Sequence, residues 1–442
     1  MSEYRKKTVK FGGSSLADAE HFRKVRDIVL SDETRKYVIP SAPGKRSSGD
    51  VKVTDMLYKC YEVARDREAF DALFKKITER FDGIIDDLGL DLSLAQEYEN
   101  IRSAMLHMSG RDYAASRGEY LNGKILSSYL GYDFIDAFDV VMFRDDGTFD
   151  ERRTEKIMSD RLRRHERAVI PGFYGAMPNG TVRTFSRGGS DFTGSIVASV
   201  SGSDLYENWT DVSGFLTADP RIVKNPGTID KITYRELREL SYMGATVLHE
   251  DAVFPVRTVG IPINIRNTNR PEDKGTFIVP ECKPGEGSVI TGIAGRHGFS
   301  VICVEKDRMN SEVGFIRKVL SVLENNGLTC EHLPSGIDTM SVVIETASIA
   351  PVRELVLNTI CTVVEPDAVS IEDGISLIAV VGRNMVRAKG TAARIIGSVA
   401  GAGVNIRMID QGSDEMNVII GVSDDDFEKA VTAIYNEFAK EQ

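Results

Sequence analysis

The sequence predicts an α/β protein in which an open, parallel-rich αβα sandwich is followed by two smaller modules. Three observations predict this fold class. From Lys7 to about Ile290, short apolar runs alternate with longer amphipathic stretches, which is typical of parallel strands joined by crossover helices. At 280–287, proline, glycine and charged residues replace this periodicity and indicate a domain boundary. Beyond the boundary, the order strand, helix, strand, strand occurs twice in succession.

The first domain is expected to span residues 1–288. Its strands are expected at 8–11, 36–39, 167–170, 202–206 and 262–265. Between 63 and 106 the chain is densely charged, with phenylalanine, leucine and isoleucine at helical spacing. We expect this stretch to form a helical subdomain at about 60–110.

The two consecutive β-α-β-β units indicate a duplicated ferredoxin-like βαββαβ module. The first is expected to contain strands at 299–304, 328–333, 340–346 and 368–372, with helices at 313–324 and 352–360. The second is expected to contain strands at 375–381, 404–409 and 416–422, with helices at 388–402 and 425–438. This second copy lacks a final strand, which the spare apolar run at 289–294 can supply. We therefore expect module 1 at 299–374, nested inside a module 2 made of 289–298 and 375–442.

Composition limits the classes of function. With 442 residues the chain is long enough for two or three domains, and its formal net charge of −11 disfavours binding to nucleic acid. The five cysteines form no C-x-x-C pair and the six histidines show no metal-ligand spacing, so neither a disulfide framework nor a structural zinc site is expected. No window approaches a membrane span, and the first residues do not resemble an export signal. We expect a cytoplasmic protein that acts on small molecules.

The opening strand carries Lys10 and runs into the turn Gly12-Gly13-Ser14. Glycines let backbone N–H groups approach an anion, the following helix points its positive end at the same place, and the lysine adds a full charge. These residues are suited to holding a nucleotide phosphate. From these residues alone, a simple turn between strand and helix stays open as the alternative.

Two further polar clusters stand at expected element ends. The loop 41–44, which leads on to Thr54, follows the second strand at the carboxyl edge of the sheet, where open α/β sheets bind ligands. The alternative is a surface loop. Glu119 follows Gly118 just before an expected helix, where it either holds an ammonium group or is a solvated acid in the first helical turn.

The segment from Arg187 to Asp191 opens a helix of small residues with the sequence Arg-Gly-Gly-Ser-Asp. Its guanidinium suits a carboxylate and its glycines expose backbone donors. An N-cap at Ser190 or Asp191 does not need the preceding Arg-Gly-Gly, so anion binding is favoured over simple capping. The polar loop 209–221 suits a nucleotide with Arg221 near its phosphates, and the alternative is a long surface loop.

Taken together and in order, these clusters resemble the aspartate kinase family of the amino-acid-kinase fold. The segment 9–15 is similar to the opening signature of that family, 187–191 to its substrate loop and 210–221 to its nucleotide loop. The repeated C-terminal modules are similar to its tandem ACT domains. The resemblance spans nearly the whole chain. It implies ATP-dependent, Mg²⁺-assisted phosphorylation of the β-carboxylate of L-aspartate to 4-phospho-L-aspartate, the first step of lysine, threonine and methionine biosynthesis.

The resemblance also implies roles for individual residues. Lys10 would neutralise the transferring phosphoryl group, with Asp191 as the second catalytic residue. Arg187 would bind the α-carboxylate of aspartate and Glu119 its amino group. The remaining substrate-binding residues would be Thr54, Phe173, Gly188, Gly189 and Ser190. The ATP site would be lined by Lys10, Gly12, Gly13, Ser14, Thr210, Asp211, Arg221 and Val247. No metal ligand from the chain is implied, since Mg²⁺ would arrive with ATP.

These residue types suffice for the chemistry. A carboxylate with a pKa near 4 is ionised at pH 7, so its attack on the γ-phosphate needs no general base. The obstacle is repulsion between anions, on the order of 5 kcal/mol per charge pair at about 3.5 Å and an effective dielectric near 20. Lys10, Mg²⁺ and the dipoles of the glycine turn would offset it, as expected for phosphoryl transfer by positioning and charge neutralisation.

The ACT resemblance implies feedback control by an amino acid bound where modules of two chains meet. The segment 309–315 is similar to the effector-binding stretch of lysine-sensitive members. The implied effector residues are Met309, Ser311, Val313, Gly314, Phe315 and Asp338. The alternative is that Val313 and Phe315 are ordinary helix core. We expect lysine as the effector and a homodimer through the ACT modules, with a tetramer left open.

Three positions depart from the family pattern. Residues 45–53 look like an insertion before Thr54, Thr246 stands where a lysine is common, and Leu216 replaces a tyrosine of the nucleotide loop. The last two favour an alternative in which the chain is a non-catalytic amino-acid sensor. A second alternative is another carboxylate kinase of the same fold.

Overall fold

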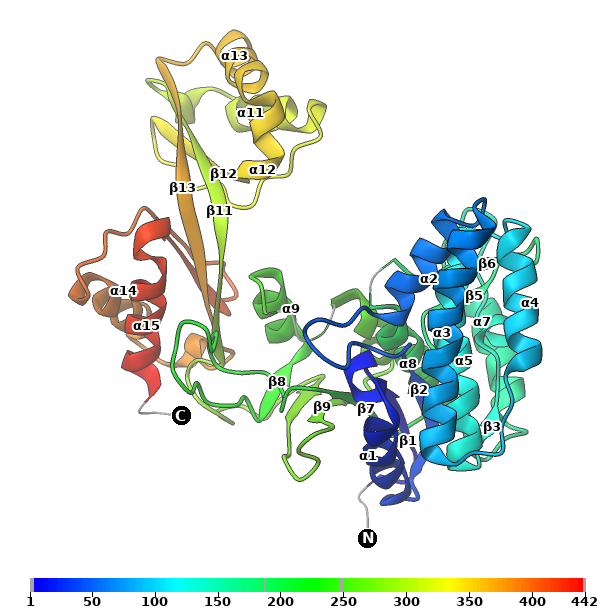
Figure 1. The fold of residues 1–442 in the computed structure, drawn as a ribbon. Coiled ribbons are helices and arrows are strands. Elements are labelled where there is room, and N and C mark those ends of the chain that lie inside the picture. The colour runs from blue at the N-terminus through cyan, green and yellow to red at the C-terminus, as the bar shows by residue number, and fades with distance from the viewer. Residues whose placement is uncertain (1–3, 187, 246–247, 249, 440–442) are drawn as a thin grey trace. The chain divides into compact units, whose positions relative to one another are not determined.

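The computed structural model describes residues 4–186, 188–245, 248 and 250–439, and its chain divides into two compact units (Figure 1). The first unit comprises 1–215, 230–234 and 246–282. The second comprises 216–229, 235–245 and 283–442. We describe each unit by itself.

The first unit is built on an eight-stranded sheet with the order β3-β4-β2-β1-β7-β9-β10-β8. All neighbouring pairs are parallel except β9 and β10, which are antiparallel. The strands are β1 (Lys7–Phe11), β2 (Arg35–Pro40), β3 (Asp133–Phe134), β4 (Ala168–Val169), β7 (Leu205–Thr210), β8 (Lys231–Thr233), β9 (Ile263–Asn267) and β10 (Thr276–Val279). A separate hairpin pairs β5 (Tyr174–Ala176) with β6 (Val182–Thr184). The expected parallel-rich sheet is confirmed, although β7 begins three residues later than predicted because Gly202 ends the preceding helix in a left-handed conformation.

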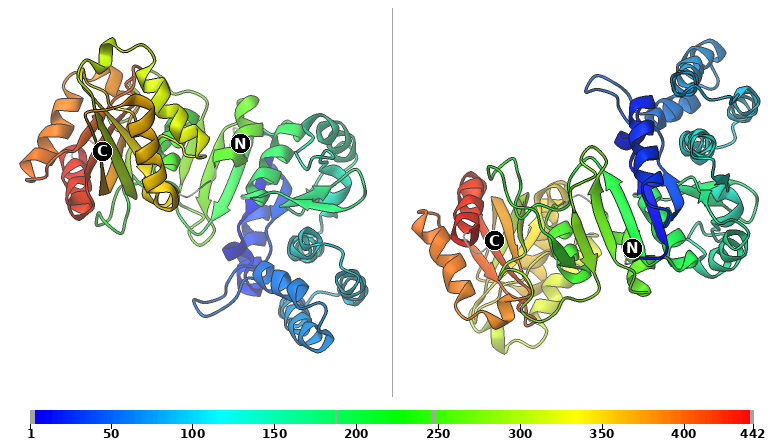
Figure 2. Two further views of the ribbon diagram at one scale, coloured as in Figure 1. Left: turned by 90° about the horizontal axis from the view of Figure 1, so that it is seen from above. Right: turned by 90° about the horizontal axis from the view of Figure 1, so that it is seen from below.

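Helices cover both faces of this sheet. They are α1 (Ala19–Leu30), α2 (Val53–Glu62), α3 (Arg67–Leu88), α4 (Ala95–Leu106), α5 (Arg111–Leu130), α6 (Ala137–Val140), α7 (Glu151–Leu162), α8 (Gly189–Ser201) and α10 (Phe254–Thr258). The expected helical subdomain corresponds to α3 and α4, which stand beside α2 and α5 in both orientations of Figures 1 and 2.

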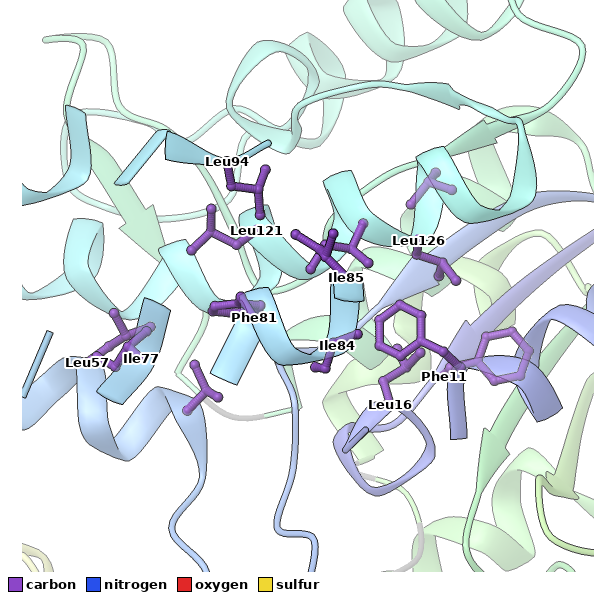
Figure 3. Packing of buried hydrophobic residues seen from close by; sticks show 14 of the residues in the cluster. Phe11, Leu16, Leu57, Ile77, Phe81, Ile84, Ile85, Leu94, Leu121 and Leu126 are labelled. Carbon is purple, nitrogen blue, oxygen red and sulfur yellow. The ribbon is translucent and has the colours of Figure 1, made fainter. Parts of the chain in front are cut away.

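Side-chain alternation along the strands separates two cores. Val9, Phe11 and Trp209 point toward the core formed with α1 to α5, where Figure 3 shows Phe11 near Leu126 of α5. Tyr37 and Ile39 point the opposite way, into the core formed with α6, α7 and α8. Because successive strand residues alternate between faces, Lys10 lies on the α8 face of β1.

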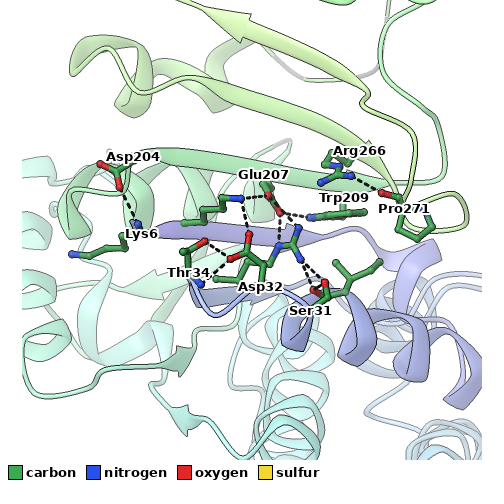
Figure 4. A network of polar contacts seen from close by, with 12 residues as sticks. Lys6, Ser31, Asp32, Thr34, Asp204, Glu207, Trp209, Arg266 and Pro271 are labelled. Carbon is green, nitrogen blue, oxygen red and sulfur yellow. Dashed lines mark hydrogen bonds and ion pairs between the residues drawn. The ribbon is translucent and has the colours of Figure 1, made fainter. Parts of the chain in front are cut away.

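A buried charge network ties the amino ends of the first-unit strands together (Figure 4). Glu207 is 1% exposed and accepts hydrogen bonds from Arg35 Nε at 2.8 Å and Trp209 Nε1 at 2.9 Å. Lys7 Nζ lies 3.3 Å from the same carboxylate. Burial alone would raise the pKa of Glu207, but the charge and hydrogen bond of Arg35, with Lys7 and Trp209, hold it below its ordinary value.

The second unit is built on a five-stranded sheet with the order β12-β11-β13-β15-β14. Its strands are β11 (Gly292–Glu305), β12 (Thr339–Glu345), β13 (Ala368–Val381), β14 (Met408–Asp410) and β15 (Asn417–Ser423). Its helices are α9 (Tyr234–Tyr242), whose first residue lies in the first unit, α11 (Phe315–Asn325), α12 (Thr346–Ile349), α13 (Arg353–Val364), α14 (Thr391–Gly401) and α15 (Phe427–Phe438).

Two strands of 14 residues, β11 and β13, run through both halves of this sheet. Their antiparallel pairing joins 292–296 to 377–381 at one end and 301–305 to 368–372 at the other. Helices α11 to α13 gather at one end of the long strands and α14 and α15 at the other (Figure 1), and the strands are seen nearly end-on in Figure 2. The apolar run 289–294, predicted to supply a strand to module 2, therefore pairs with the strand expected at 375–381. The observed strand, β11, begins at Gly292 rather than at Val289.

Three predictions for the second unit need correction. The expected strand 328–333 is absent from the described residues as a regular strand and makes only an isolated bridge at His332. The strand expected at 404–409 is reduced to β14 (Met408–Asp410). The helix expected at 313–324 begins at Phe315, because Gly314 is left-handed at its N-cap.

One stretch of the described residues, 346–364, is long and apolar enough to cross a membrane by length and composition. In the structure it consists of α12, a 3₁₀ turn containing Pro351, and α13. Val356 and Ile360 of α13 are buried in the core under β11 and β12. The stretch is thus part of the second unit's packing, and the cytoplasmic location stays a prediction.

Replacing Glu207 by glutamine should lower the free energy of unfolding by about 3–5 kcal/mol, because Arg35 would keep a buried charge without its carboxylate, whereas Lys7 would retain Asp32 at 2.8 Å. The measurement is urea unfolding followed by the fluorescence of Trp209, the single tryptophan of the chain. The matched control is Glu166→Gln, whose carboxylate pairs with Lys36 at the exposed surface. Equal effects of the two substitutions would contradict the importance of the buried network.

Candidate active site

Lys10 is held on the α8 face of β1 by partners from two other elements. Its Nζ lies 2.6 Å from Asp191 Oδ1, in the first turn of α8, and 3.5 Å from Asn208 Oδ1 on β7. Asn208 Nδ2 donates to the same Asp191 oxygen at 2.8 Å. The β1–β7 register places Lys10 directly opposite Asn208. An ammonium has three donors, so this arrangement fixes the lysine and leaves donor capacity for an anion.

The glycine turn touches the neighbouring loop backbone to backbone. Gly44 N–H donates to Gly13 O at 2.8 Å. A Cβ on Gly13 would lie 2.8 Å from the Ala42 carbonyl oxygen, and one on Gly44 would lie 2.6 Å from the Gly13 carbonyl carbon. No other residue fits at either position without displacing backbone, so these glycines serve close approach rather than positive φ. The predicted anion cradle therefore has two walls, 12–14 and 41–44.

Glu119 lies in the middle of α5 rather than ahead of a helix, and it is 5% exposed rather than solvated. The first-turn alternative is therefore wrong. Gly118 brings the helix against the second wall, because a Cβ there would lie 2.8 Å from Ala42 Cβ. Glu119 Oε2 is buried without a hydrogen-bond partner. Burial raises the pKa of Glu119 to about 8, although the backbone of Ala42 and the charge of Arg117 oppose the shift.

The substrate loop is described only in part, because Arg187 lies outside the described residues. Gly188 is the left-handed N-cap of α8. The alternative in which Ser190 or Asp191 caps this helix is therefore wrong. A Cβ on Gly189 would lie 2.5 Å from the ring of Phe173. Phe173 itself has φ of 83°, and its N–H donates to Thr193 Oγ1 at 3.0 Å. This conformation is strained for a side chain, and the structure around α8 imposes it.

One pocket of about 650 Å³ collects most of the remaining predicted residues, and we call it the glycine-turn pocket. Its lining joins both walls to the start of α2, the middle of α5 and the end of β7. The predicted residues that line it are Gly12, Gly13, Ser14, Thr54, Glu119, Thr210 and Asp211. Lys45, Arg46 and Lys52, from the stretch read as an insertion, also line it. The pocket thus combines a positive loop with a buried carboxylate of which one oxygen has no hydrogen-bond partner.

Three predicted nucleotide residues, Lys10, Arg221 and Val247, are not among the described residues that line this pocket. Val247 and the departure at Thr246 lie outside the described residues. Arg221 belongs to the second unit, where its guanidinium pairs with Asp219 Oδ2 at 2.5 Å and its side chain is 87% exposed. Its place at the phosphates stays a prediction.

Sequence reasoning missed Asn208 and the cations of 45–52. Asn208 carries no local motif, and only the pairing of β1 with β7 shows that it faces Lys10. The cations were visible as a charged run, but the run looked like an insertion between a loop and Thr54 rather than a wall of the pocket.

The predicted effector residues surround one turn of the second unit. Met309 and Phe315 are buried, so the core interpretation holds for Phe315, whereas Val313 is 96% exposed and is not helix core. Asp338 Oδ1 accepts the Arg308 N–H at 2.9 Å. Ser311 ends a 3₁₀ turn two residues before Val313.

Comparison with known proteins decides the family. A model of the amino acid kinase family matches residues 6–267, and a model of the ACT domain matches residues 378–438. Aspartokinase 3 of Bacillus subtilis (strain 168) is 40% identical to this chain and is matched over 98% of both sequences. The chain belongs to the aspartokinase family.

Solved structures agree with this membership. The crystal structure of Clostridium acetobutylicum aspartate kinase is 52% identical, has a TM-score of 0.93, and covers 98% of this chain and 100% of its own. Escherichia coli aspartokinase III, solved with aspartate and ADP, shares the fold at 24% identity and a TM-score of 0.75, covering 98% of this chain and 100% of its own. The same protein has also been solved with lysine and aspartate. The predicted kinase activity class, amino-acid-kinase fold and ACT modules of this aspartokinase are therefore confirmed.

Ionisation of Glu119 should make the stability of this aspartokinase depend on pH. A carboxyl group whose pKa rises from 4.5 to about 8 on folding keeps its proton in the folded state and loses it on unfolding between those values. The free energy of unfolding should therefore fall as pH rises from about 4.5 to about 8. Glu119→Gln should flatten this fall, measured by urea unfolding across the range. Parallel pH profiles for the two proteins would show that Glu119 ionises normally.

Proposed function

We propose that this aspartokinase transfers the γ-phosphoryl group of ATP to the β-carboxylate of L-aspartate and releases 4-phospho-L-aspartate and ADP. The observation that carries the proposal is the glycine-turn pocket, which joins a glycine cradle to the unpartnered oxygen of Glu119. A phosphate and an amino group have opposite charges, and a substrate pair of ATP and an amino acid presents both. Phosphorylation of aspartate as the entry to lysine, threonine and methionine synthesis follows from this assignment.

Lys10 provides the charge that the reaction needs. Two anions must approach within contact distance, and Lys10 is already fixed at the end of β1 by Asp191 and Asn208. A preorganised donor of this kind stabilises the charge that spreads over the transferring phosphoryl oxygens without reorganisation during the reaction. Asp191 then acts by orienting Lys10. The acceptor carboxylate is ionised at neutral pH and needs no base.

Glu119 accepts the ammonium group of aspartate. The carboxylate is disfavoured while its buried oxygen stays without a hydrogen-bond partner, and a bound ammonium supplies the missing donor. Binding of aspartate therefore favours the ionised form of Glu119. Arg187 takes the α-carboxylate of the substrate, and Thr54 and Phe173 complete the acceptor side.

MgATP is the second substrate. Gly12, Gly13 and Ser14 offer backbone N–H groups to its phosphates, and Thr210 and Asp211 line the same pocket at the end of β7. Mg²⁺ bound to the phosphates supplies further charge neutralisation. We place Arg221 and Val247 on the nucleotide side as well.

Lysine is the feedback inhibitor in this proposal, and it binds at the turn 309–315. Asp338 faces that turn, since Asn310 N–H donates to Ile337 O at 3.0 Å and Arg308 N–H donates to Asp338. A carboxylate there suits an amino-acid ammonium group. The exposed side chains of Val313 and Ile337, 96% and 68% exposed, support a homodimer through the ACT modules in which the effector is covered.

Lys10→Ala should lower kcat for ADP release in the presence of aspartate and MgATP by a factor of about 100 or more, because a preorganised donor to the developing charge is lost. A coupled assay for ADP, with direct detection of acyl phosphate, measures it. Lys36→Ala is the control, since Lys36 pairs with exposed Glu166 near the amino end of β2. Lys10 lies opposite Ile39, near the carboxyl end of that strand. Full activity in Lys10→Ala would overturn the assignment.

Asp338→Asn should raise the lysine concentration needed for half-inhibition at least tenfold while leaving uninhibited kcat unchanged. The reason is loss of the charge that pairs with the effector's ammonium group. Asp414→Asn in the other half of the sheet is the matched control. If both variants keep the inhibition of the unsubstituted enzyme, lysine does not bind at this turn. Size-exclusion chromatography with and without lysine tests whether the protein is a homodimer.

A further inference from the structure

Arg80 is a buried arginine for which the chemistry above gives no role. It lies in α3, in the helical subdomain rather than on the sheet, and its side chain is 4% exposed. The neighbouring residues Ile77, Phe81 and Ile84 fix α3 in the core of the first unit. Burying a guanidinium is costly unless it is paired and hydrogen-bonded, so its partners decide what it does.

The guanidinium contacts the second wall of the glycine-turn pocket and the turn that continues the first wall. Nη2 donates to the carbonyl oxygen of Gly44 and, at 3.2 Å, to that of Ala17. Ala17 ends the 3₁₀ turn that begins at Gly13, and Gly44 is the residue whose backbone touches Gly13. One side chain from α3 therefore connects the second wall to the end of the 3₁₀ turn that begins in the first wall.

The same guanidinium also holds the loop that follows the second wall. Nη1 donates to Asp50 Oδ2 at 2.9 Å and to Val51 O at 3.2 Å. Asp50 in turn closes the loop on itself, because it accepts the backbone N–H and the Nε of Arg46, both at 2.9 Å. The hydrogen bonds of Arg46 and the charge of Arg80 lower the pKa of Asp50 well below its ordinary value, although burial opposes them.

This loop brings positive charge to the pocket. Lys45, Arg46 and Lys52 all line the glycine-turn pocket, although residues 45–49 are exposed to solvent. Like charges on an exposed loop repel one another, so the loop needs a fixed anchor to keep them on one side. Among the described residues, Arg80 is the arginine that contacts Gly44, Asp50 and Val51 together.

We propose that Arg80 is a positioning residue that holds the loop 45–52, the second wall and the 3₁₀ turn of the first wall in the arrangement that binds the phosphates of the nucleotide. The identity of that anion rests on the proposed function. The role needs a planar fork, because four acceptors from three segments must be reached by one group. Lysine has a single nitrogen and cannot span them.

Kinetics give the first test. Arg80→Met and Arg80→Lys should each raise KM for MgATP at least tenfold, with a smaller change in KM for aspartate. The control is Arg35→Met, which removes another buried arginine of the same unit whose partners, Glu207 and Ile28 O, lie outside the pocket. That control should lower the melting temperature but leave both KM values within twofold. A KM for MgATP that is unchanged in Arg80→Met, or that rises equally in Arg35→Met, overturns the proposal.

Limited proteolysis gives a test that needs no catalysis. Trypsin cleavage after Lys45, Arg46 and Lys52, located by mass spectrometry, should be at least tenfold faster in native Arg80→Met than in the unsubstituted protein. Asp50→Asn should show the same faster cleavage. It replaces Arg80→Met as the test variant if that protein fails to fold, because the side chain of Asp50 is 16% exposed and less buried than that of Arg80. Equal cleavage rates in all proteins contradict the anchoring role. If the unsubstituted protein does not phosphorylate aspartate but its loop is released in the variants, the proposed function fails and the role of Arg80 stands.

Discussion

The ion pair of Lys10 with Asp191 is the contact on which the first unit depends. A buried ammonium requires a carboxylate, and this carboxylate comes from the first turn of α8 while the amide of Asn208 comes from β7. The requirement joins three elements at one point. It also explains the close packing around α8, where Gly189 leaves room for the ring of Phe173 and where Phe173 accepts a strained backbone. The geometry that orients the charge is therefore set by how α8 meets the sheet.

The two walls of the pocket beside this ion pair meet backbone to backbone. Gly13 and Gly44 approach one another so closely that neither can carry a Cβ, and Gly118 brings α5 against the same wall. Backbone walls offer N–H groups at fixed positions, which suits phosphate, but they have no side chains to hold them apart or together. Arg80 of α3 supplies that support from behind. The helical subdomain is thus part of the construction of the site through Arg80 of α3, whereas Glu119 on the acceptor side belongs to α5.

Much of this could be predicted from the sequence, because the motifs are local. The strand with Lys10 and the glycine turn was recognisable from the seven consecutive residues 9–15, and the repeated order of elements indicated the ACT pair. What could not be predicted depended on distant segments. The partnership of Asn208 with Lys10 needs the strand register, and the burial of Glu119 was hidden because polar residues at 111–117 masked the first turns of α5. Arg80 stands in the densely charged stretch 63–106, and nothing near it in the sequence indicates its partners.

The two long strands of the second unit have a consequence for how such a chain can evolve. Because β11 and β13 each contribute to both halves of the sheet, neither half owns a complete set of strands. Recombination that cut the gene between the halves would leave an unpaired strand edge on each product, and such edges invite aggregation. The two ACT modules must therefore be inherited, exchanged or lost together. A twist imposed on one half of the sheet is transmitted to the other half along the continuous backbone of β11 and β13.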